Sequence, residues 1–422
     1  MKIGIIGGGA AGLTCAISSK KKDNEVIILE RNAECGKKIL ATGNGRCNYW
    51  NEDQSIKHYE SSSSYLIPEL INEETEEYVK NFFQELGIVP KIKNGYFYPK
   101  SNQAITIRNT LVEEAIDRGV QIKYNYLVKS IEKIKDKFIV NKELEFDKIV
   151  LSTGSYAAPN TGSDGMGYSF LKKMNHTIIK PLPALVQLNA KNYSFLKKWK
   201  GIRSDVRVSF LEKTISSNEL ESMSKELKGK IWIKNKDKIQ IYKYQEGEIQ
   251  LTDYGISGIC VFNLSNAVGR TLERKEKAIV EIDFLPDFDA ITYLEKDKSI
   301  KRILDCLLNE KLVDILLEEA NIKKDTKFTE LTDEEKQSLL RKIHRFELEI
   351  ISTKSFQEAQ VSSGGVTLEE INLDTMESRL VNDLYVIGEL LDLTGECGGY
   401  NLGICFRSGV IAGLAIRGDF DD

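Results

Sequence analysis

Three glycines near the start of the chain have the spacing of a phosphate-binding turn. Gly7, Gly9 and Gly12 form the pattern Gly-x-Gly-x-x-Gly between an apolar run, 2–6, and a run of small residues, 10–19. The first glycine permits a tight turn, the second lets the backbone approach a pyrophosphate, and the third lets the helix pack on the strand. The helix start, with Ala10 and Ala11, offers unpaired N–H groups and a positive dipole end to phosphates.

An acidic residue follows the second predicted strand, 25–29, at the position that such a turn requires. Glu30 there would accept hydrogen bonds from the ribose hydroxyls of an adenine dinucleotide and repel a 2′-phosphate. Strand, helix and acid follow one another in the expected order. The alternative interpretation, that these are only turn glycines, is therefore disfavoured.

Two further segments favour FAD over NAD as the dinucleotide. After the second strand comes a glycine-rich loop, 36–48, which is long enough to lie along an extended cofactor. Near the carboxyl end a short apolar strand, 384–387, runs into Gly388-Glu389, then a glycine-rich stretch, 395–403, and an apolar helix, 402–416. These two segments are far apart in sequence, and binding of one ligand by both suits FAD better than NAD.

Several motifs together resemble the BaiN-like (YhiN-like) FAD-dependent oxidoreductases, a family that includes aminoacetone oxidase and a bile-acid dehydro-steroid reductase. They are TGNGRCN at 42–48, GSDGMGY at 162–168, LPALVQL at 182–188, LTDYGISG at 251–258, AQVSSGGV at 359–366, DTMES at 374–378 and GELLDLTGECGGYNLGICFRSG at 388–409. The resemblance covers essentially the whole chain. It implies an α/β fold: a Rossmann-like, glutathione-reductase-like FAD-binding domain, split in sequence by an inserted β-barrel-like and helical domain.

With that family in view, the predicted domains are 1–190 for the first part of the FAD-binding domain, 191–355 for the inserted substrate or lid domain, and 356–422 for the second part. The insertion is predicted to be β-rich over 191–290 and helical over 291–355. The predicted cofactor-binding residues are Gly7, Gly9, Ala10, Ala11, Gly12, Glu30, Arg31, Lys38, Thr42, Gly43, Gly45, Arg46, Cys47, Asn48, Val128, Thr153, Gly154, Gly388, Glu389, Gly399, Tyr400, Asn401 and Leu402.

The chain departs from the family pattern at three positions. The family tends to carry His where LTDYG has Asp253, Pro where this chain has Cys260, and Gly where it has Asn175. If that imidazole serves catalysis in relatives, Asp253 must act differently here.

The expected reaction is hydride transfer between flavin N5 and a small molecule, either an amine or an unsaturated carbonyl compound such as a dehydro-steroid. NAD(P)H or oxygen would complete the flavin cycle. The sequence assigns no catalytic acid or base; Tyr400, Asp253 and Cys47 are the weak candidates. Two alternatives stay open: a thiol or quinone reductase that uses Cys47 and Cys397, and a flavin-binding module without turnover.

Composition narrows the expected partners and location. The 422 residues carry 59 Lys and Arg against 63 Asp and Glu, so no global basic field favours nucleic acid or an anionic membrane. The seven cysteines form no C-x-x-C pair, and this fits a reducing cytoplasm and no metal site. We therefore expect a cytoplasmic enzyme with a small-molecule substrate and no nucleic-acid or membrane partner; the sequence carries no signal of oligomeric state.

Overall fold

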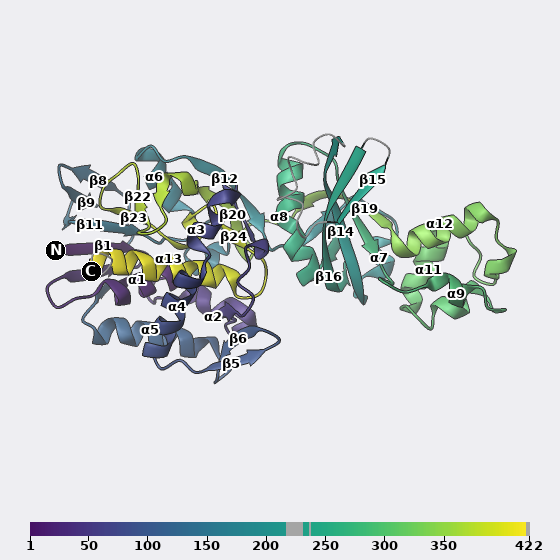
Figure 1. Ribbon diagram of the computed structural model, residues 1–422, viewed down its shortest axis with the longest axis horizontal. Helices are drawn as coiled ribbons and strands as arrows, with labels where there is room; N and C mark the ends of the chain where they lie inside the picture. Colours follow the sequence, from purple (N-terminus) through teal and green to yellow (C-terminus); the bar gives the residue numbers. More distant parts are fainter. Residues whose placement is uncertain (217–230, 236–237, 419–422) are drawn as a thin grey trace. The chain divides into compact units, whose positions relative to one another are not determined.

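The computed structural model describes residues 1–216, 231–235 and 238–418. It divides the chain into two compact units (Figure 1): unit 1 contains 1–182 and 360–422, and unit 2 contains 183–359. The sequence-based boundaries at 190/191 and 355/356 therefore differ from this division by four to eight residues. Residues 217–230 and 236–237, which the β-rich prediction includes, lie outside the described residues.

Unit 1 is built on a seven-stranded sheet with the order β21-β22-β23-β11-β1-β2-β7. Five neighbours run parallel: β23 (Leu384–Val386), β11 (Lys148–Leu151), β1 (Lys2–Ile6), β2 (Glu25–Leu29) and β7 (Gln121–Lys123). The antiparallel strands β22 (Glu377–Ser378) and β21 (Ile371–Asn372) complete one edge. The central strands are apolar and buried, as in parallel sheets that other elements cover on both faces.

Two helices from opposite ends of the chain pack directly on each other beside this sheet. They are α1 (Ala10–Ser19), which is wholly buried, and α13 (Tyr400–Arg417). A Cβ at Gly409 would lie 2.7 Å from the Ala11 carbonyl oxygen, and one at Gly413 would overlap Ser18. Successive contacts advance in the same direction along both helices, so α1 and α13 are parallel (Figure 1).

The remaining described elements of unit 1 are helices and small sheets. The helices are α2 (Lys37–Ala41), α3 (Ile67–Leu70), α4 (Glu73–Glu85), α5 (Ala104–Asp117) and α6 (Met166–Lys173). The small sheets are β3 (Trp50–Asn51) with β6 (Tyr96–Pro99) and β5 (Pro90–Lys93); β8 (Ile131–Ile134), β9 (Lys137–Val140) and β10 (Leu144–Phe146); β4 (Tyr59–Glu60) with β24 (Thr394–Gly395); and β12 (Ile178–Ala184) with β20 (Val361–Val366).

Unit 2 contains a closed antiparallel β-barrel. The ring runs β14 (Arg203–Ser216), β18 (Ala278–Asp283), β19 (Phe346–Thr353), β13 (Leu188–Ala190), β17 (Gly255–Ser257) and β16 (Lys238–Leu251), and β16 pairs back with β14; β15 (Ile231–Asn235) adds to β16 outside the ring. Its helices are α7 (Leu196–Trp199), α8 (Ile259–Glu273), α9 (Ala290–Leu294), α10 (Ile300–Leu304), α11 (Glu310–Glu319) and α12 (Asp333–His344). The predicted barrel-plus-helix insertion is confirmed.

One secondary-structure boundary within the insertion was predicted wrongly. The range 291–355 is not helical to its end, because α12 stops at His344 and 346–353 form β19. Phe346, Leu348 and Ile350 alternate into the core, which is the period of a strand. The β-rich range 191–290 also contains the fifteen-residue helix α8, which packs on β16 and β14.

The two units have separate hydrophobic cores that share no residue. The core of unit 1 is formed by β1, β2, β11 and β23 with α1 and α13, and the core of unit 2 by the barrel interior and its helices. Across the described residues, no helix is long and apolar enough to cross a membrane.

Candidate active site

The predicted residues converge because four parallel strands end at the same edge of one sheet. Gly7 follows β1, Glu30 follows β2, Thr153 and Gly154 lie just beyond β11, and Gly388 lies beyond β23. In open α/β sheets ligands bind outside the carboxyl ends of the strands. This edge of unit 1 is therefore the candidate site.

The glycine turn has the geometry that its sequence predicted. Gly7 has φ +103°, which favours glycine, and a Cβ there would lie 2.7 Å from the Ser152 carbonyl oxygen. A Cβ at Gly12 would overlap the carbonyl oxygen of Gly7, so the helix can approach the strand only without a side chain. A Cβ at Gly9 would meet nothing within 4 Å. Because α1 has no side-chain cap and no acid in its first turn, its N-terminus can accept an anion.

Glu30 is 6% exposed and already has protein donors on both oxygens. The backbone N–H of Gly8 donates to Oε2 at 2.8 Å, and Asn32 donates to Oε1 through its backbone N–H and its Nδ2, both at 2.8 Å. Each oxygen has more than one acceptor site, so a ribose hydroxyl can still be bound. Arg31, by contrast, is exposed and forms an ion pair with Asp164.

Lys38 and Glu389 link the loop after β2 to the carboxyl-terminal segment. Lys38 Nζ lies 2.7 Å from Glu389 Oε2, across 351 residues of sequence. Gly388 abuts the start of α1, since a Cβ there would lie 2.9 Å from Ala11 Cβ, and a Cβ at Gly154 would lie 3.9 Å from Glu389 Oε2. Glu389 Oε1 is buried and has no hydrogen-bond partner. A ligand hydroxyl at this position would satisfy it.

The loop after α2 has an unusual left-handed course. Gly43, Asn44, Gly45 and Cys47 all have φ between +54° and +78°. The loop is closed by hydrogen bonds from Arg46 N to Gly43 O at 3.2 Å and from Cys47 N to Thr42 O at 3.1 Å. Asn48 Oδ1 is buried without a hydrogen-bond partner, and the Arg46 side chain is exposed. Val128, the predicted residue outside these segments, is buried after β7.

The N-terminus of α13 forms the other end of the site. Gly399, at φ +95°, precedes the helix, which has no side-chain cap and no acid in its first turn. Asn401 fixes the preceding loop, because its Oδ1 accepts from Gly395 N at 2.9 Å and its Nδ2 donates to Gly395 O at 2.7 Å. Leu402 is partly buried against the core.

The two parallel helices begin at different levels along their shared direction. Ala11 lies opposite Gly409, so α13 begins about eight residues, or ~12 Å, before α1 along their shared direction. Glu389 and Lys38 lie beside the start of α1. One helix N-terminus can hold a pyrophosphate while the second faces a group farther along the same extended ligand.

Sequence reasoning missed several residues around the start of α13. Trp50 contacts Gly399 and Gly403, and its Nε1 is buried without a hydrogen-bond partner. Arg407 is fully buried with its guanidinium 4.8 Å from the Trp50 ring centroid, and burial lowers its pKa to about 10. Ser362 is 3% exposed with an unpartnered hydroxyl, and its carbonyl oxygen accepts from Thr394 Oγ1 at 3.3 Å. The family motif AQVSSGGV was the only signal for Ser362.

The donor set fits FAD. Two uncapped helix N-termini suit the pyrophosphate and the electron-accepting ring edge, and Glu30 and the unpartnered oxygen of Glu389 suit ribose and ribityl hydroxyls. Asn48 Oδ1 is an unpartnered buried acceptor, and Trp50 Nε1 is an unpartnered buried donor. The fold and this site define an FAD-binding flavoprotein with a split Rossmann-like domain.

The weak catalytic candidates are placed differently from one another. Tyr400 is 4% exposed at the first position of α13, and burial raises its pKa well above the usual range. Asp253 belongs to unit 2, where it is exposed and 2.7 Å from Lys200 Nζ, whose hydrogen bond lowers the pKa of the carboxyl.

The two other departures from the family pattern have local explanations. Asn175 has φ +66°, which Asn tolerates, and Cys260 lies in the first turn of α8, where Pro is also accepted.

Burial weighs against thiol chemistry. All seven cysteines are free, and burial raises the pKa of both Cys47 and Cys397 to about 12. Since the thiolate is the reactive form, neither side chain is a nucleophile at neutral pH.

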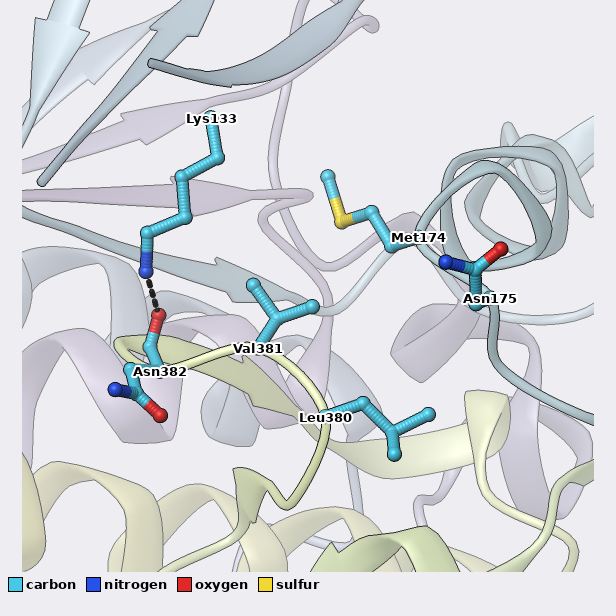
Figure 2. A pocket seen from close by; sticks show the side chains of 6 residues that line it. All are labelled: Lys133, Met174, Asn175, Leu380, Val381 and Asn382. Carbon is cyan, nitrogen blue, oxygen red and sulfur yellow. Dashed lines mark hydrogen bonds between the residues drawn. The ribbon is translucent and has the colours of Figure 1, made fainter. Parts of the chain in front are cut away.

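A separate pocket of about 560 Å³ opens on another part of unit 1 (Figure 2). Lys133, Met174, Asn175, Leu380, Val381 and Asn382 line it, and Lys133 Nζ donates to the Asn382 carbonyl oxygen. None of the predicted cofactor-binding residues is among these, so the pocket is not part of the candidate site. Among the described residues no group of His, Cys, Asp and Glu could hold a metal ion.

Comparison with known proteins identifies the family. Residues 1–415 match the model of the HI0933-like protein Rossmann domain. The chain is 34% identical to the 3-dehydro-bile acid delta(4,6)-reductase of Clostridium scindens, over 98% of each protein, and 27% identical to the ribosomal RNA dihydrouridine synthase of Haemophilus influenzae, over 98% of this chain and 97% of that protein. A solved 3-ketosteroid delta1-dehydrogenase from Sterolibacterium denitrificans is 11% identical, with a TM-score of 0.48 over 99% of both chains.

The chain belongs to the HI0933-like family, and the resemblance to the BaiN-like flavoproteins is confirmed. It is an FAD-dependent oxidoreductase.

Proposed function

We propose that this oxidoreductase saturates a carbon–carbon double bond conjugated to a carbonyl group in a small molecule, with NADH or NADPH as electron donor to its flavin. When bound, FAD supplies an N5 atom that accepts and donates hydride. The observation that carries the proposal is the uncapped N-terminus of α13, whose backbone N–H groups favour negative charge in the bound group.

The names of the relatives support this substrate chemistry. A 3-dehydro-bile acid with delta(4,6) unsaturation has double bonds conjugated to its 3-oxo group, and formation of dihydrouridine saturates a double bond conjugated to a ring carbonyl. In both reactions hydride adds to an electron-poor carbon and the carbonyl oxygen takes up negative charge. We infer the same reaction type for this chain. We also infer a cytoplasmic location, which its seven free cysteines favour.

Anaerobic mixing experiments test the proposal through the absorbance of the bound flavin. NADH or NADPH should bleach the flavin, and a conjugated dienone steroid should restore its colour without oxygen. Bleaching by amines alone would instead indicate an amine oxidase that passes electrons to oxygen. A flavin that neither nicotinamide nucleotide reduces would contradict the proposed donor, and a reduced flavin that no conjugated enone reoxidises would contradict the proposed substrate class.

A second candidate substrate is uridine in ribosomal RNA. Two of the relatives that align over nearly the whole chain are ribosomal RNA dihydrouridine synthases, and residues 191–250 carry 14 Lys and Arg against 8 Asp and Glu. Several of these cations are already paired, for example Arg203 with Glu248 and Lys200 with Asp253. We therefore favour the small molecule. Conversion of uridine to dihydrouridine in unmodified ribosomal RNA, detected by mass spectrometry, would reverse that preference.

A further inference from the structure

His58 lies between two carboxylates at the edge of the site. Its Nδ1 is 2.8 Å from Glu396 Oε2, and its Nε2 is 2.9 Å from Asp53 Oδ2. The imidazole is 18% exposed and the Glu396 side chain 14%, so solvent competes little for that contact, whereas the Asp53 side chain is 48% exposed and its contact is more open to water. Only the protonated ring has an N–H on both nitrogens, and therefore only that form donates to both carboxylates at once.

This residue joins segments that are 338 positions apart. The backbone N–H of Glu396 donates to the His58 carbonyl oxygen at 2.9 Å, and the adjacent strands β4 and β24 pair with each other. The imidazole also stacks on Tyr400, the first residue of α13, with ring centroids 4.6 Å apart and planes at 20°. One side chain thus contacts both the loop that precedes α13 and the first turn of that helix.

We propose that His58 is a positioning residue: its imidazolium bridges Asp53 and Glu396 and so holds the 395–399 loop and the N-terminus of α13 in the conformation that receives the flavin ring. The inference rests on the placement of FAD in the candidate site. Loss of the proton leaves one carboxylate facing a ring lone pair, and the bridge opens on that side.

Near neutral pH the charge change belongs to His58, because the tyrosines and the thiol around it stay neutral and Asp53 stays ionised. The titratable and charged groups around it are Asp53, Lys57, Tyr59, Glu60, Glu76, Tyr96, Glu396, Cys397, Tyr400 and Arg407. Burial raises the pKa of the three tyrosines and of the Cys397 thiol, so these groups stay neutral. The hydrogen bonds from Ser55, His58 and Lys57 lower the pKa of Asp53, which stays ionised.

The direction of the pH effect follows from the same contacts. Burial alone would lower the pKa of His58, but the hydrogen bonds to Glu396 and Asp53 outweigh it and raise the pKa above its ordinary value of 6.5. A raised pKa means that the bridge is fully present below 6.5 and is lost as the pH rises through the folded-state pKa. Flavin should therefore be held more tightly on the acidic side of this transition.

The test measures the rate at which the holoenzyme releases FAD between about pH 6 and about pH 9. Release is monitored as the recovery of flavin fluorescence. In the unmodified protein we expect release to accelerate about tenfold across the transition, the effect of losing one charge-assisted hydrogen bond. His58→Gln should release FAD at the fast rate at every pH. Glu396→Gln should move the transition to lower pH, because one of the carboxylates that raise the pKa of His58 is gone.

His344→Gln is the matched control, since His344 Nδ1 contacts Asp283 Oδ1 at 3.0 Å in unit 2; it should follow the unmodified protein. A His58→Gln protein that keeps the original pH dependence would overturn the proposal. If that variant does not fold, an unmoved transition in Glu396→Gln would overturn it. Hydrogen exchange of residues 394–399 in FAD-free protein gives an independent readout: exchange should accelerate through the same transition, and pH-independent protection would overturn the proposal even where FAD does not bind.

Discussion

Glu389 uses one of its two carboxylate oxygens within the described structure. Oε2 pairs with Lys38, whereas Oε1 is buried and unpartnered, a state that costs free energy unless a donor arrives with the ligand. A hydroxyl donor on bound FAD would remove this cost.

Glu389→Gln should weaken FAD binding by about tenfold to a hundredfold, because a neutral amide is the poorer acceptor and Lys38 loses its counter-charge. Titration of the FAD-free protein with FAD, followed by flavin fluorescence, measures the change. Glu369→Gln is the control; its carboxylate accepts from Tyr65 OH at 2.9 Å and Ser63 Oγ at 3.1 Å, and none of these three is a predicted cofactor-binding residue. Equal affinity in the two variants would contradict the assigned role of Glu389.

The thiols of Cys47, which is buried, and Cys397, which is partly exposed, give a second prediction at this scale. Burial raises the pKa of Cys47 and Cys397 to about 12, so the Cys47→Ala, Cys397→Ala protein should keep turnover within about twofold of the original. In the unmodified protein, mass spectrometry after brief alkylation near pH 8 should find the exposed Cys306 labelled well before Cys47. A double variant that retains FAD but loses turnover would restore the thiol-reductase alternative.

At the scale of elements, the close contact of α1 and α13 holds the two helix N-termini at their offset. A Cβ at Gly409 would lie 2.7 Å from a backbone oxygen and 2.9 Å from Thr14 Cβ, neither of which can move without shifting a helix. The offset between the N-termini of α1 and α13 thus depends on the absence of a side chain at Gly409, two turns inside α13.

Gly409→Ala should lower the free energy of unfolding by about 1–3 kcal/mol and weaken FAD binding, because overpacking separates the helices. Gly269→Ala in α8 is the matched control: a Cβ there meets Thr353 Cγ2 at 3.6 Å, an ordinary contact, so gained helix propensity should make it neutral or stabilising by up to about 1 kcal/mol. Chemical denaturation and FAD titration measure both. Equal stability of the two variants would contradict the packing argument.

Sequence patterns predicted the features that depend on residues close together in the chain. The glycine turn follows from the φ and space requirements of Gly7 and Gly12, and these depend on nearby backbone. The bridge from Glu396 to His58 joins segments 338 positions apart, and no local pattern indicates such a pair. β19 was mistaken for helix because it follows α12 after one residue and carries charged residues on its outer face. The assigned cofactor contacts stay predictions, as does the role of the insertion as a lid.

At the scale of the whole molecule, the inserted unit is joined to the rest of the chain where β12 and β20 pair side by side. The chain leaves unit 1 after Leu182 and returns at Gln360, and Thr367 N donates to Thr177 O at 3.2 Å near that crossing. Among the described residues, the hydrophobic cores of the two units share no residue. Unit 1 therefore has the requirements of an independent domain.

Replacement of residues 183–359 by a short Gly-Ser linker should give a folded protein that binds FAD, because every predicted cofactor-binding residue belongs to unit 1. If the insertion supplies the substrate pocket, NADH or NADPH should still bleach the flavin of this protein, while turnover of an enone falls to background. Absorbance of the purified protein and anaerobic titration measure the two steps separately. Loss of FAD would contradict the independence of unit 1, and unchanged turnover would contradict the role of the insertion in substrate binding.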